Sequence, residues 1–402
     1  MGNRVYKTVS NTVKSINANN AVINVGTNEL TVVDLVSDTN DTGIHIDGSE
    51  NQLTISNHST VNDGSTTIYT KTATADQASI ENNNGNLKVV ITDPSTLSND
   101  NTEAGNQVSK IVALGEQSTA GYTGKAVEGD VAGERTFTID ENNNLVSMTE
   151  KQNSVLSGLR DISTNNFLAF RSQMNDLDKR MGDLCTMPST DGAGARIIAG
   201  QSEYKSTHNT HQTLQIGGDR RIGDFLVGGA LSYTDGNGSL KNGSTDDKAY
   251  SFGIYGSWLG QDGQFADVIL KHHHQETDYD LRYTNGTKAK GSYDTSGTSI
   301  SAEYGWRLGI ANTDYYVEPQ VEFMYVHMNS VGYKTSNGVK VSQDAIKAAV
   351  GRLGVAAGWV SPDKTGSAYV KASVLNDWAG NARVKASKNG ITRRFHEDMG
   401  GT

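Results

Sequence analysis

The order of hydrophobic and polar residues divides the chain into three stretches, each with its own period. Residues 1–148 carry short runs of Val, Ile, Leu and Thr, separated by clusters of Asn, Asp, Gly and Ser. Each run has the length of one short β-strand, and the residues between the runs tolerate tight-turn geometry. The runs expected to be strands are residues 21–25, 29–33, 43–46, 52–56, 67–70 and 86–91.

The scarcity of aromatic residues indicates how these strands pack. The first 150 residues contain only four aromatic side chains. A β-solenoid needs few aromatics, because its stacked coils bury one narrow aliphatic column and pair Asn and Thr in ladders. We therefore expect a β-solenoid. A disordered low-complexity segment is the alternative, and the recurring Val and Ile runs argue against it. His45 and His58 are expected at the surface or in turns.

The period changes from two to that of a helix near Thr149. An apolar stripe recurs at steps of three and four, which is the spacing of one helix face. Thr149 and Gln152 resemble a capping box, and Pro188 bars continuation. One helix is therefore expected over residues 149–186. Its stripe consists of Val155, Leu159, Ile162, Met174, Leu177, Met181 and Leu184.

Residues 187–402 return to a period of two. Over residues 225–233, Phe, Val, Leu and Tyr take one face while Gly, Ala and Ser take the other, and similar alternation recurs in 298–308 and 315–325. A transmembrane β-barrel strand alternates in this way, with apolar side chains toward lipid and polar ones toward the lumen. About nine strands are expected, near residues 193–205, 211–220, 225–234, 249–259, 265–281, 294–310, 315–333, 345–360 and 367–378.

The phase of this alternation assigns side chains to faces, because a slip of one residue would reverse every face. Trp306, Phe323 and Trp359 are expected to point outward toward lipid. The lumen-facing candidates are Glu303, Arg307, Glu318, Glu322 and Arg352. The same phase places Arg196, Asp219, Asp267, Lys271, Lys371 and Asp377 inward.

Composition narrows the chemistry. Residues 1–150 hold 8 Lys and Arg against 19 Asp and Glu, whereas residues 191–402 hold 22 of each, so two chemically different halves are joined. The single cysteine, Cys185, excludes a disulfide framework and a Cys-based zinc site. His272–His274 are adjacent in a strand and alternate in direction, so these three cannot converge on one ion. No metal and no cofactor are expected, and no apolar run is long enough for a membrane-spanning helix.

The helical stretch carries the most specific motif. Residues 173–184, Gln-Met-Asn-Asp-Leu-Asp-Lys-Arg-Met-Gly-Asp-Leu, are similar to the Asn-Asn-Leu-Asn-Lys-Arg-Met-Gly-Asp-Leu segment of autotransporters, the type V secretion proteins. The resemblance is to the serine-protease autotransporter barrel and covers about residues 150–402. Further similar blocks, in family order, are residues 192–196, 212–219, 250–256, 301–305, 317–320, 350–354 and 366–373.

This resemblance implies an all-β protein with one long helix. A β-solenoid-like passenger end would occupy residues 1–148, a linker helix inside the barrel residues 149–186, and an antiparallel transmembrane β-barrel residues 187–402. The implied function is an outer-membrane translocator that anchors and exports its own N-terminal passenger to the cell surface. The implied partners are outer-membrane lipid and the barrel assembly machinery, and no nucleic acid. The first residues lack the apolar core of a signal peptide.

The resemblance also implies a self-cleavage reaction. In serine-protease autotransporters, the bond between paired Asn residues of this helix is broken autocatalytically. Asn175 keeps the nucleophile, whose side-chain amide would attack its own main-chain carbonyl, while Asp176 replaces the second Asn. The negative charge beside the scissile bond leaves both cleavage and retention of the passenger open. With no conventional catalytic site, single-turnover cleavage at Asn175–Asp176 is the one candidate reaction.

The expected number of strands differs from that of the family, so other fold and function classes remain as alternatives. Family barrels have twelve strands, and the chain ends at Gly400-Gly-Thr402 after about nine, so an incomplete, C-terminally truncated barrel is expected. A soluble β-helical fibre or spike with a structural or adhesive role is the alternative. Heat-modifiable mobility in detergent would favour the barrel, and SDS-resistant trimers the fibre. A porin-like channel does not suit the acidic segment, and a hydrolytic enzyme lacks a site.

Overall fold

The computed structural model of the chain describes residues 5–6, 12–25, 29–46, 48, 52–174, 191–363 and 366–401. The chain forms two compact units, Met1–Asn153 and Ser154–Thr402. The first unit is built almost entirely of β-strands, and the second combines one long helix with antiparallel sheets. Each unit has its own packing logic.

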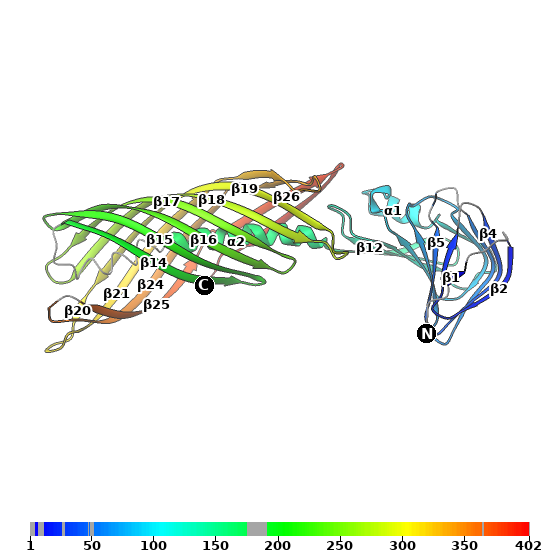
Figure 1. The fold of residues 1–402 in the computed structure, drawn as a ribbon, viewed down its shortest axis with the longest axis horizontal. Helices are drawn as coiled ribbons and strands as arrows, with labels where there is room; N and C mark the ends of the chain where they lie inside the picture. Colours follow the sequence, from blue (N-terminus) through cyan, green and yellow to red (C-terminus); the bar gives the residue numbers. More distant parts are fainter. Residues whose placement is uncertain are drawn as a thin grey trace. The chain divides into compact units, whose positions relative to one another are not determined.

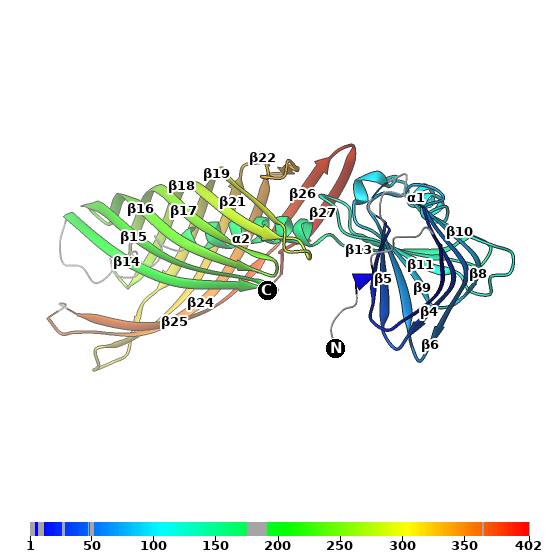
Figure 2. The ribbon, with the colours of Figure 1, turned by 45° about the vertical axis from the view of Figure 1, so that its right-hand side comes forward.

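The first unit is a two-sheet β-solenoid, as the sequence predicts (Figure 2). Successive strands alternate between two parallel sheets, so each coil adds one strand to each sheet. Each of the six predicted runs lies in a strand, to within one residue at its start. The first sheet, in spatial order, is β1 (Val5–Tyr6), β3 (Val22–Val25), β5 (Asp41–Ile46), β7 (Ser65–Thr70), β9 (Leu87–Ile91), β11 (Tyr122–Ala126), β12 (Glu134–Ile139) and β13 (Leu145–Lys151). The second sheet is β10 (Val112–Leu114), β8 (Ala78–Asn84), β6 (Leu53–Val61), β4 (Leu30–Asp38) and β2 (Thr12–Ala18).

In-register stacking of like residues explains the stability of the coils. Val32, Ile55 and Ile80 are aligned across β4, β6 and β8, and all three are buried. Because each coil supplies a branched aliphatic residue at the same position, the apolar column is continuous from coil to coil. The insertion between β9 and β10 holds a short 3₁₀ turn, η1 (Pro94–Thr96), and the helix α1 (Asn101–Val108). The antiparallel strands β12 and β13 extend the first sheet past its last parallel strand.

The expected surface position of His58 is wrong. Its side chain lies inside the solenoid, with 1% of the residue exposed. His58 Nδ1 lies 2.5 Å from Asn83 Oδ1, and Nε2 lies 2.7 Å from the hydroxyl of Thr66. Because an amide oxygen only accepts, Nδ1 donates and Nε2 accepts from Thr66. Burial lowers the pKa of this imidazole below its usual value, so the ring is held neutral. The other histidine, His45, stacks on Tyr69 with ring centroids 4.6 Å apart.

The helix begins later than the sequence predicts. Helix α2 spans Ser154–Met174, and the expected start at Thr149 is wrong because Thr149 pairs with Thr136 in the β12–β13 hairpin. Leu145 and Met148 of that hairpin pack on the solenoid core, which favours the extended conformation there. The part of the expected helix beyond Met174 lies outside the described residues. Among the described residues, no helix combines the length and the apolar character needed to cross a bilayer.

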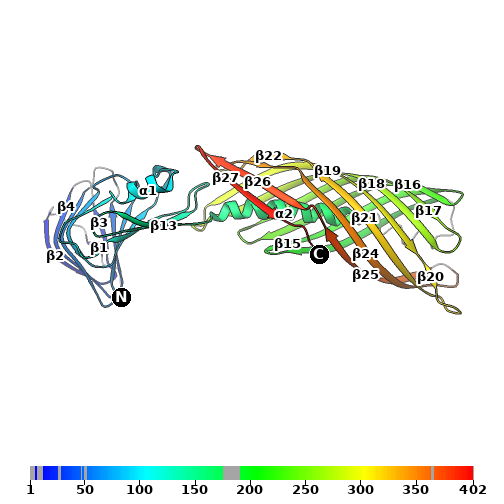
Figure 3. The ribbon, with the colours of Figure 1, turned by 180° about the vertical axis from the view of Figure 1, so that it is seen from behind.

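The second unit is a ten-stranded antiparallel sheet that curves around helix α2 (Figures 1 and 3). Its nine consecutively paired strands match the nine that the sequence predicts. They are β14 (Asp191–Tyr204), β15 (Thr207–Ile222), β16 (Phe225–Leu240), β17 (Gly243–Leu259), β18 (Gln264–Arg282), β19 (Lys288–Trp306), β21 (Tyr315–Met328), β24 (Ile346–Val360) and β25 (Ser367–Asp377). The two-residue strand β20 (Leu308–Gly309) pairs with β21. A separate four-stranded sheet contains β22 (Val331–Lys334), β23 (Lys340–Gln343), β26 (Asn381–Lys388) and β27 (Ile391–Asp398).

The two faces of the ten-stranded sheet have opposite character. The outer face carries exposed apolar side chains such as Tyr250, Phe252 and Ile254. The inner face carries buried polar ones such as Asp247 and Lys271, and helix α2 packs against it. Polar and apolar residues of the helix are both buried, including the adjacent Ser163, Thr164, Asn165 and Asn166. The helix therefore presents polar groups to a polar wall.

Candidate functional site

The centre of the inner face is a buried carboxylate, Asp247 of β17. Its side chain accepts hydrogen bonds from five neutral donors, and the residue is 4% exposed. The shortest come from Asn165 Nδ2 and Thr277 Oγ1, each at 2.7 Å. The others are Thr245 Oγ1 at 3.1 Å and the amides of Asn209 and Gln275 at 3.4 Å each. Burying a charge is tolerable only when hydrogen bonds replace its water, and this ring of donors fulfils that requirement.

Helix α2 delivers two adjacent amides to this centre. Asn165 donates to Asp247 and also to Thr245 Oγ1, while its own oxygen accepts from Asn209 Nδ2 at 3.0 Å. Asn166 donates to the hydroxyl of Tyr293. The Asn166 oxygen accepts from Gln275 Nε2 at 2.8 Å and from Thr277 Oγ1 at 2.9 Å. Because the partners come from β15, β17, β18 and β19, both the height and the rotation of the helix are fixed.

Close backbone approach and aromatic contacts support this seating. An added Cβ at Gly238 would lie 2.5 Å from Asn165 Oδ1, and one at Gly297 would lie 2.6 Å from a ring carbon of Phe170. Only glycine therefore lets the helix side chains lie so close to the wall at these two positions. Phe170 also packs on the ring of His273, with centroids 4.4 Å apart. The polar centre is thus flanked by tight van der Waals contacts.

A second cluster on the inner face contains the lumen-facing candidates. Glu303, Glu322 and Arg352 are aligned across β19, β21 and β24. Arg352 pairs with Glu303 at 2.8 Å and with Glu322 at 2.5 Å, while Arg307 pairs with Glu318 at 2.6 Å. The two glutamates paired with Arg352, the glutamate paired with Arg307, and Arg352 itself are all buried, and Arg307 is largely buried. One guanidinium therefore bridges two buried carboxylates, with a different nitrogen of its planar group toward each.

Neighbouring charges complete this cluster. Lys371 lies 3.8 Å from Glu303, and Asp267 lies directly opposite Glu303 in the register of β18 and β19. The aromatic residues expected on the other face are Trp306 and Phe323, which are exposed, and Trp359, which is half-buried. Glu303 and Trp306 therefore lie on opposite faces of β19.

The structure reaches only part of the predicted site. Asn175, Asp176 and Cys185 lie outside the described residues. Asp247 and its partners Asn165 and Asn166 were not predicted from the sequence. The alternation along β17 would have placed Asp247 on the inner face, because Asp247 lies an odd number of residues from Tyr250 and from Phe252, and both aromatic residues are exposed. No local pattern identifies Asn165 or Asn166, because their partners come from distant strands.

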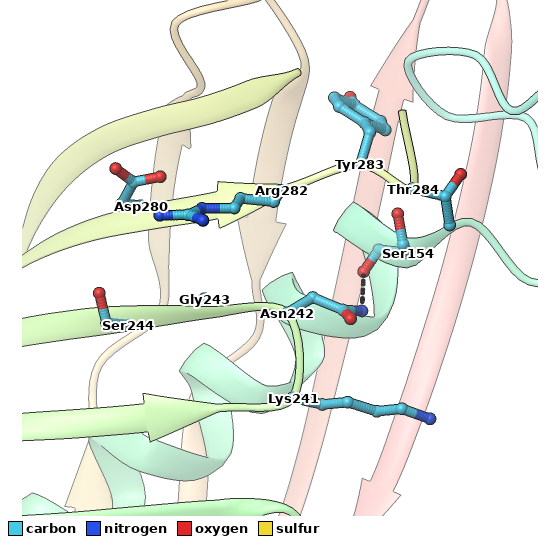
Figure 4. Close-up of a pocket in the computed structure, with 9 residues that line it drawn as sticks. All are labelled: Ser154, Lys241, Asn242, Gly243, Ser244, Asp280, Arg282, Tyr283 and Thr284. Carbon is cyan, nitrogen blue, oxygen red and sulfur yellow. Dashed lines mark hydrogen bonds between the residues drawn. The ribbon is translucent and has the colours of Figure 1, made fainter. Parts of the chain in front are cut away.

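A polar pocket of about 460 Å³ lies at one end of the sheet, where helix α2 begins (Figure 4). Asn242 Nδ2 donates to the main-chain oxygen of Ser154 at 3.0 Å, which ties the β16–β17 turn to the first turn of the helix. Asp280 on the pocket wall pairs with Lys288 and Lys290 at 3.1 Å each. The pocket thus marks a second point, after Asp247, at which the sheet holds the helix.

Comparison with known proteins identifies the second unit. The family model of the autotransporter β-domain matches residues 190–402. The chain is 31% identical over 201 residues to the BrkA autotransporter of Bordetella pertussis, which covers 46% of this chain and 19% of the relative. It is 28% identical over 236 residues to the pertactin autotransporter of Bordetella parapertussis, covering 56% of this chain and 25% of the relative.

A solved structure is also similar to part of the chain. The β-domain of the Bordetella autotransporter BrkA shares 25% sequence identity and a TM-score of 0.43, covering 52% of this chain and 93% of that one. The chain spans a quarter or less of the length of the curated relatives named above. The family match nevertheless takes in more than half of the chain. The chain therefore belongs to the autotransporter β-domain family.

Proposed function

We propose that residues 154–402 anchor the protein in the outer membrane and translocate the N-terminal solenoid, as a passenger, to the cell surface. The observation that carries this proposal is the seating of helix α2, the segment that follows the solenoid, on a polar inner wall. Asn165 and Asn166 have partners on four strands of that wall. A helix that stays inside the barrel after export would need hydrogen-bond partners on the wall for its polar side chains.

The charged cluster and the apolar outer face fit the same role. Glu303, Arg307, Glu318, Glu322 and Arg352 would line the lumen, where paired charges keep a passage polar. Exposed side chains such as Phe252, Ile254 and Phe323 would face membrane lipid. The division into a passenger end at 1–148, a linker at 149–186 that contains helix α2, and a barrel at 187–402 remains part of this proposal.

Cell fractionation tests the location and the partners. In the cell that makes it, the protein should remain with outer membranes after carbonate extraction and show heat-modifiable mobility in SDS. Antibody against the solenoid should bind intact cells. Depletion of the outer-membrane barrel assembly machinery should reduce both signals together. Recovery in the soluble fraction, with SDS-resistant trimers, would favour the alternative of a soluble β-helical fibre or spike.

We also propose that the passenger is released by cleavage of the Asn175–Asp176 bond. The Asn175 amide nitrogen would attack its own carbonyl carbon, forming a succinimide and freeing the amino group of Asp176. Asn175→Asp should abolish release, because a carboxylate at neutral pH cyclises poorly. Asp176→Asn should accelerate release by removing a negative charge beside the developing oxyanion.

The cleavage products distinguish this bond from the other candidate in the helix. Asn165 precedes Asn166, but the Asn165 amide nitrogen already donates to Asp247 and Thr245, which holds it as a donor. Mass spectrometry of the retained fragment should therefore find Asp176 at its N-terminus. A fragment beginning at Asn166, or unchanged release in Asn175→Asp, would contradict the proposal. No release in any variant would mean that the passenger stays attached.

A further inference from the structure

The polar end of the outer face brings together three metal-ligating side chains that the sequence separates. His274 and Glu276 lie two residues apart on β18, so their side chains share a face. Asp294 of β19 lies directly opposite Glu276 in the strand register. One ligand atom from each of the three residues lies within 4.8 Å of the other two. Of the three adjacent histidines, His273 is buried on the inner face, whereas His272 and His274 are exposed on the outer face.

The two carboxylates of this cluster are placed where like charges repel. Directly opposite residues on one face have Cβ atoms about 4.5–5.5 Å apart, and like charges in that position destabilise a sheet. Glu276 and Asp294 are both exposed on the outer face and occupy such a pair. The nearest compensating charge in register is Lys248 of β17, opposite Glu276 on its other side. His274 Nε2 lies 3.9 Å from Glu276, so the imidazole is already turned toward the carboxylates.

We propose that His274, Glu276 and Asp294 bind a divalent transition-metal ion of the zinc class. Imidazole nitrogen with carboxylate oxygen is a donor set that suits zinc, and three protein ligands leave an open position for water. In a tetrahedral site, ligand atoms lie about 3.4 Å apart, given metal–ligand distances of about 2.0–2.2 Å. The ligand atoms, now within 4.8 Å of one another, therefore have to close by at most about 1.4 Å, which rotation of the terminal torsions of these exposed side chains allows.

The surroundings give the site a physical consequence. His272 and His274 also border an apolar groove of about 480 Å³ on the outer face, lined by Leu214, Leu231, Tyr250 and Phe252 among others. The ion would lie at the margin between this apolar surface and the charged ends of the strands. It would link β18 to β19 and turn a repulsive carboxylate pair into a ligand pair. Metal binding should therefore raise the resistance of the sheet to heat.

Zinc titration of the tag-free full chain in detergent micelles tests the proposal. Zinc chloride should bind at one site by calorimetry and in competition with a chelating dye. Glu276→Gln and Asp294→Asn should each weaken binding at least about tenfold, since each removes a charged ligand. Lys248→Gln should tighten binding by about two- to fivefold, because it removes a positive charge next to the ion. Magnesium or calcium chloride should not displace the zinc, because imidazole suits softer ions.

A matched histidine elsewhere on the sheet serves as the control. His208 pairs with Glu203 at 2.8 Å across β14 and β15, with no third metal ligand of the described residues beside it. His208→Gln should leave zinc affinity unchanged, whereas His274→Gln should lose it. Circular dichroism and heat-modifiable mobility establish that each variant is folded. Equal affinity in Glu276→Gln and the parent chain, or an equal loss in His208→Gln, would overturn the proposal.

Discussion

The solenoid and the ten-stranded sheet use the same strand period in opposite senses. In the solenoid, Ile55 points to a dry core, while Asp34 and Asn57 form a hydrogen-bonded ladder on the outside, 2.9 Å apart. In the sheet, Ile254 is exposed on the outer face, and Asp247 is buried on the inner one. Apolar residues thus point inward in one unit and outward in the other.

The difference shows that alternation reports two faces but not which of them is covered by protein. The solenoid covers its apolar face with its own second sheet, so burial follows the hydrophobic effect. The second unit covers its polar face with helix α2 and leaves the apolar face exposed, which in the proposed membrane location would contact lipid. Buried side chains of the sheet must therefore be satisfied by ion pairs and hydrogen bonds, as Arg352 and Asp247 are. Four predictions test this inversion.

The largest effect is expected where an apolar residue replaces a charge on the inner face. Arg352→Leu should lower the free energy of unfolding of the sheet by about 3–5 kcal/mol, because it leaves Glu322 buried without its cation and Glu303 with only Lys371, 3.8 Å away. Urea titration of the heat-modifiable form in detergent measures this. Leu353→Ala, one residue along on the outer face, should cost only about 0.5 kcal/mol. Equal costs would mean that the inner face is not governed by its charges.

The next effect compares one residue type in the two units. Ile55→Ala, at a fully buried position of the solenoid, should cost about 2–5 kcal/mol. Ile254→Ala, at a position 48% exposed on the outer face, should cost about 1 kcal/mol in detergent. Denaturant titration, followed separately by proteolysis of each unit, gives both values. If Ile254→Ala cost as much as Ile55→Ala, the proposal that the outer face contacts lipid or detergent would be contradicted.

A smaller effect is expected at the contact between the helix and the wall. Asp247→Asn should cost about 1–3 kcal/mol, because its amide turns a donor toward other donors. Hydrogen exchange in α2 should increase accordingly. The exchange Asn165→Asp with Asp247→Asn keeps one carboxylate and one amide in contact and should restore much of the protection. Failure of the double variant to exceed both single variants would show that the two residues are not coupled.

The smallest effect is a pH dependence confined to the solenoid. His58 has a folded pKa below 6.5, so the unfolded chain binds the proton more readily. The stabilisation is fully present above pH 6.5 and is lost as pH falls from there toward the folded pKa. His58→Leu places a leucine in register with Leu35 of the preceding coil. This variant should abolish the dependence of the solenoid's free energy of unfolding on pH between 6.5 and 5. The lowered carboxyl pKa values of Asp38 and Asp140 act only below 3.8, outside that window. If the free energy of unfolding of His58→Leu still depended on pH in this window, another group would be responsible.

Much of the fold follows from local patterns. The six apolar runs of the solenoid and the nine long strands of the sheet were predictable, because burial on one face imposes a period of two. Helix α2 was predictable from its stripe, although its start was not. Pairing of Thr149 with Thr136 overrides a capping signal that occupies only a few residues. The sheet of β22, β23, β26 and β27 was missed in part. The exposed face of β26 carries Asn381, Arg383 and Lys385 in place of the apolar residues that mark the outer face of the longer strands.

What the sequence determined by itself was therefore the strands, the helix and the two faces of each strand, since these depend on neighbours a few residues apart. Only the tertiary structure decided which distant side chains meet. Asp247 lies 82 residues from Asn165, and that contact depends on the register of several strands and the height of the helix. His58 was misplaced for the same reason, because its burial depends on Asn83 and Thr66 in other strands. Period is a local property, whereas satisfaction of a buried polar group is a property of the whole fold.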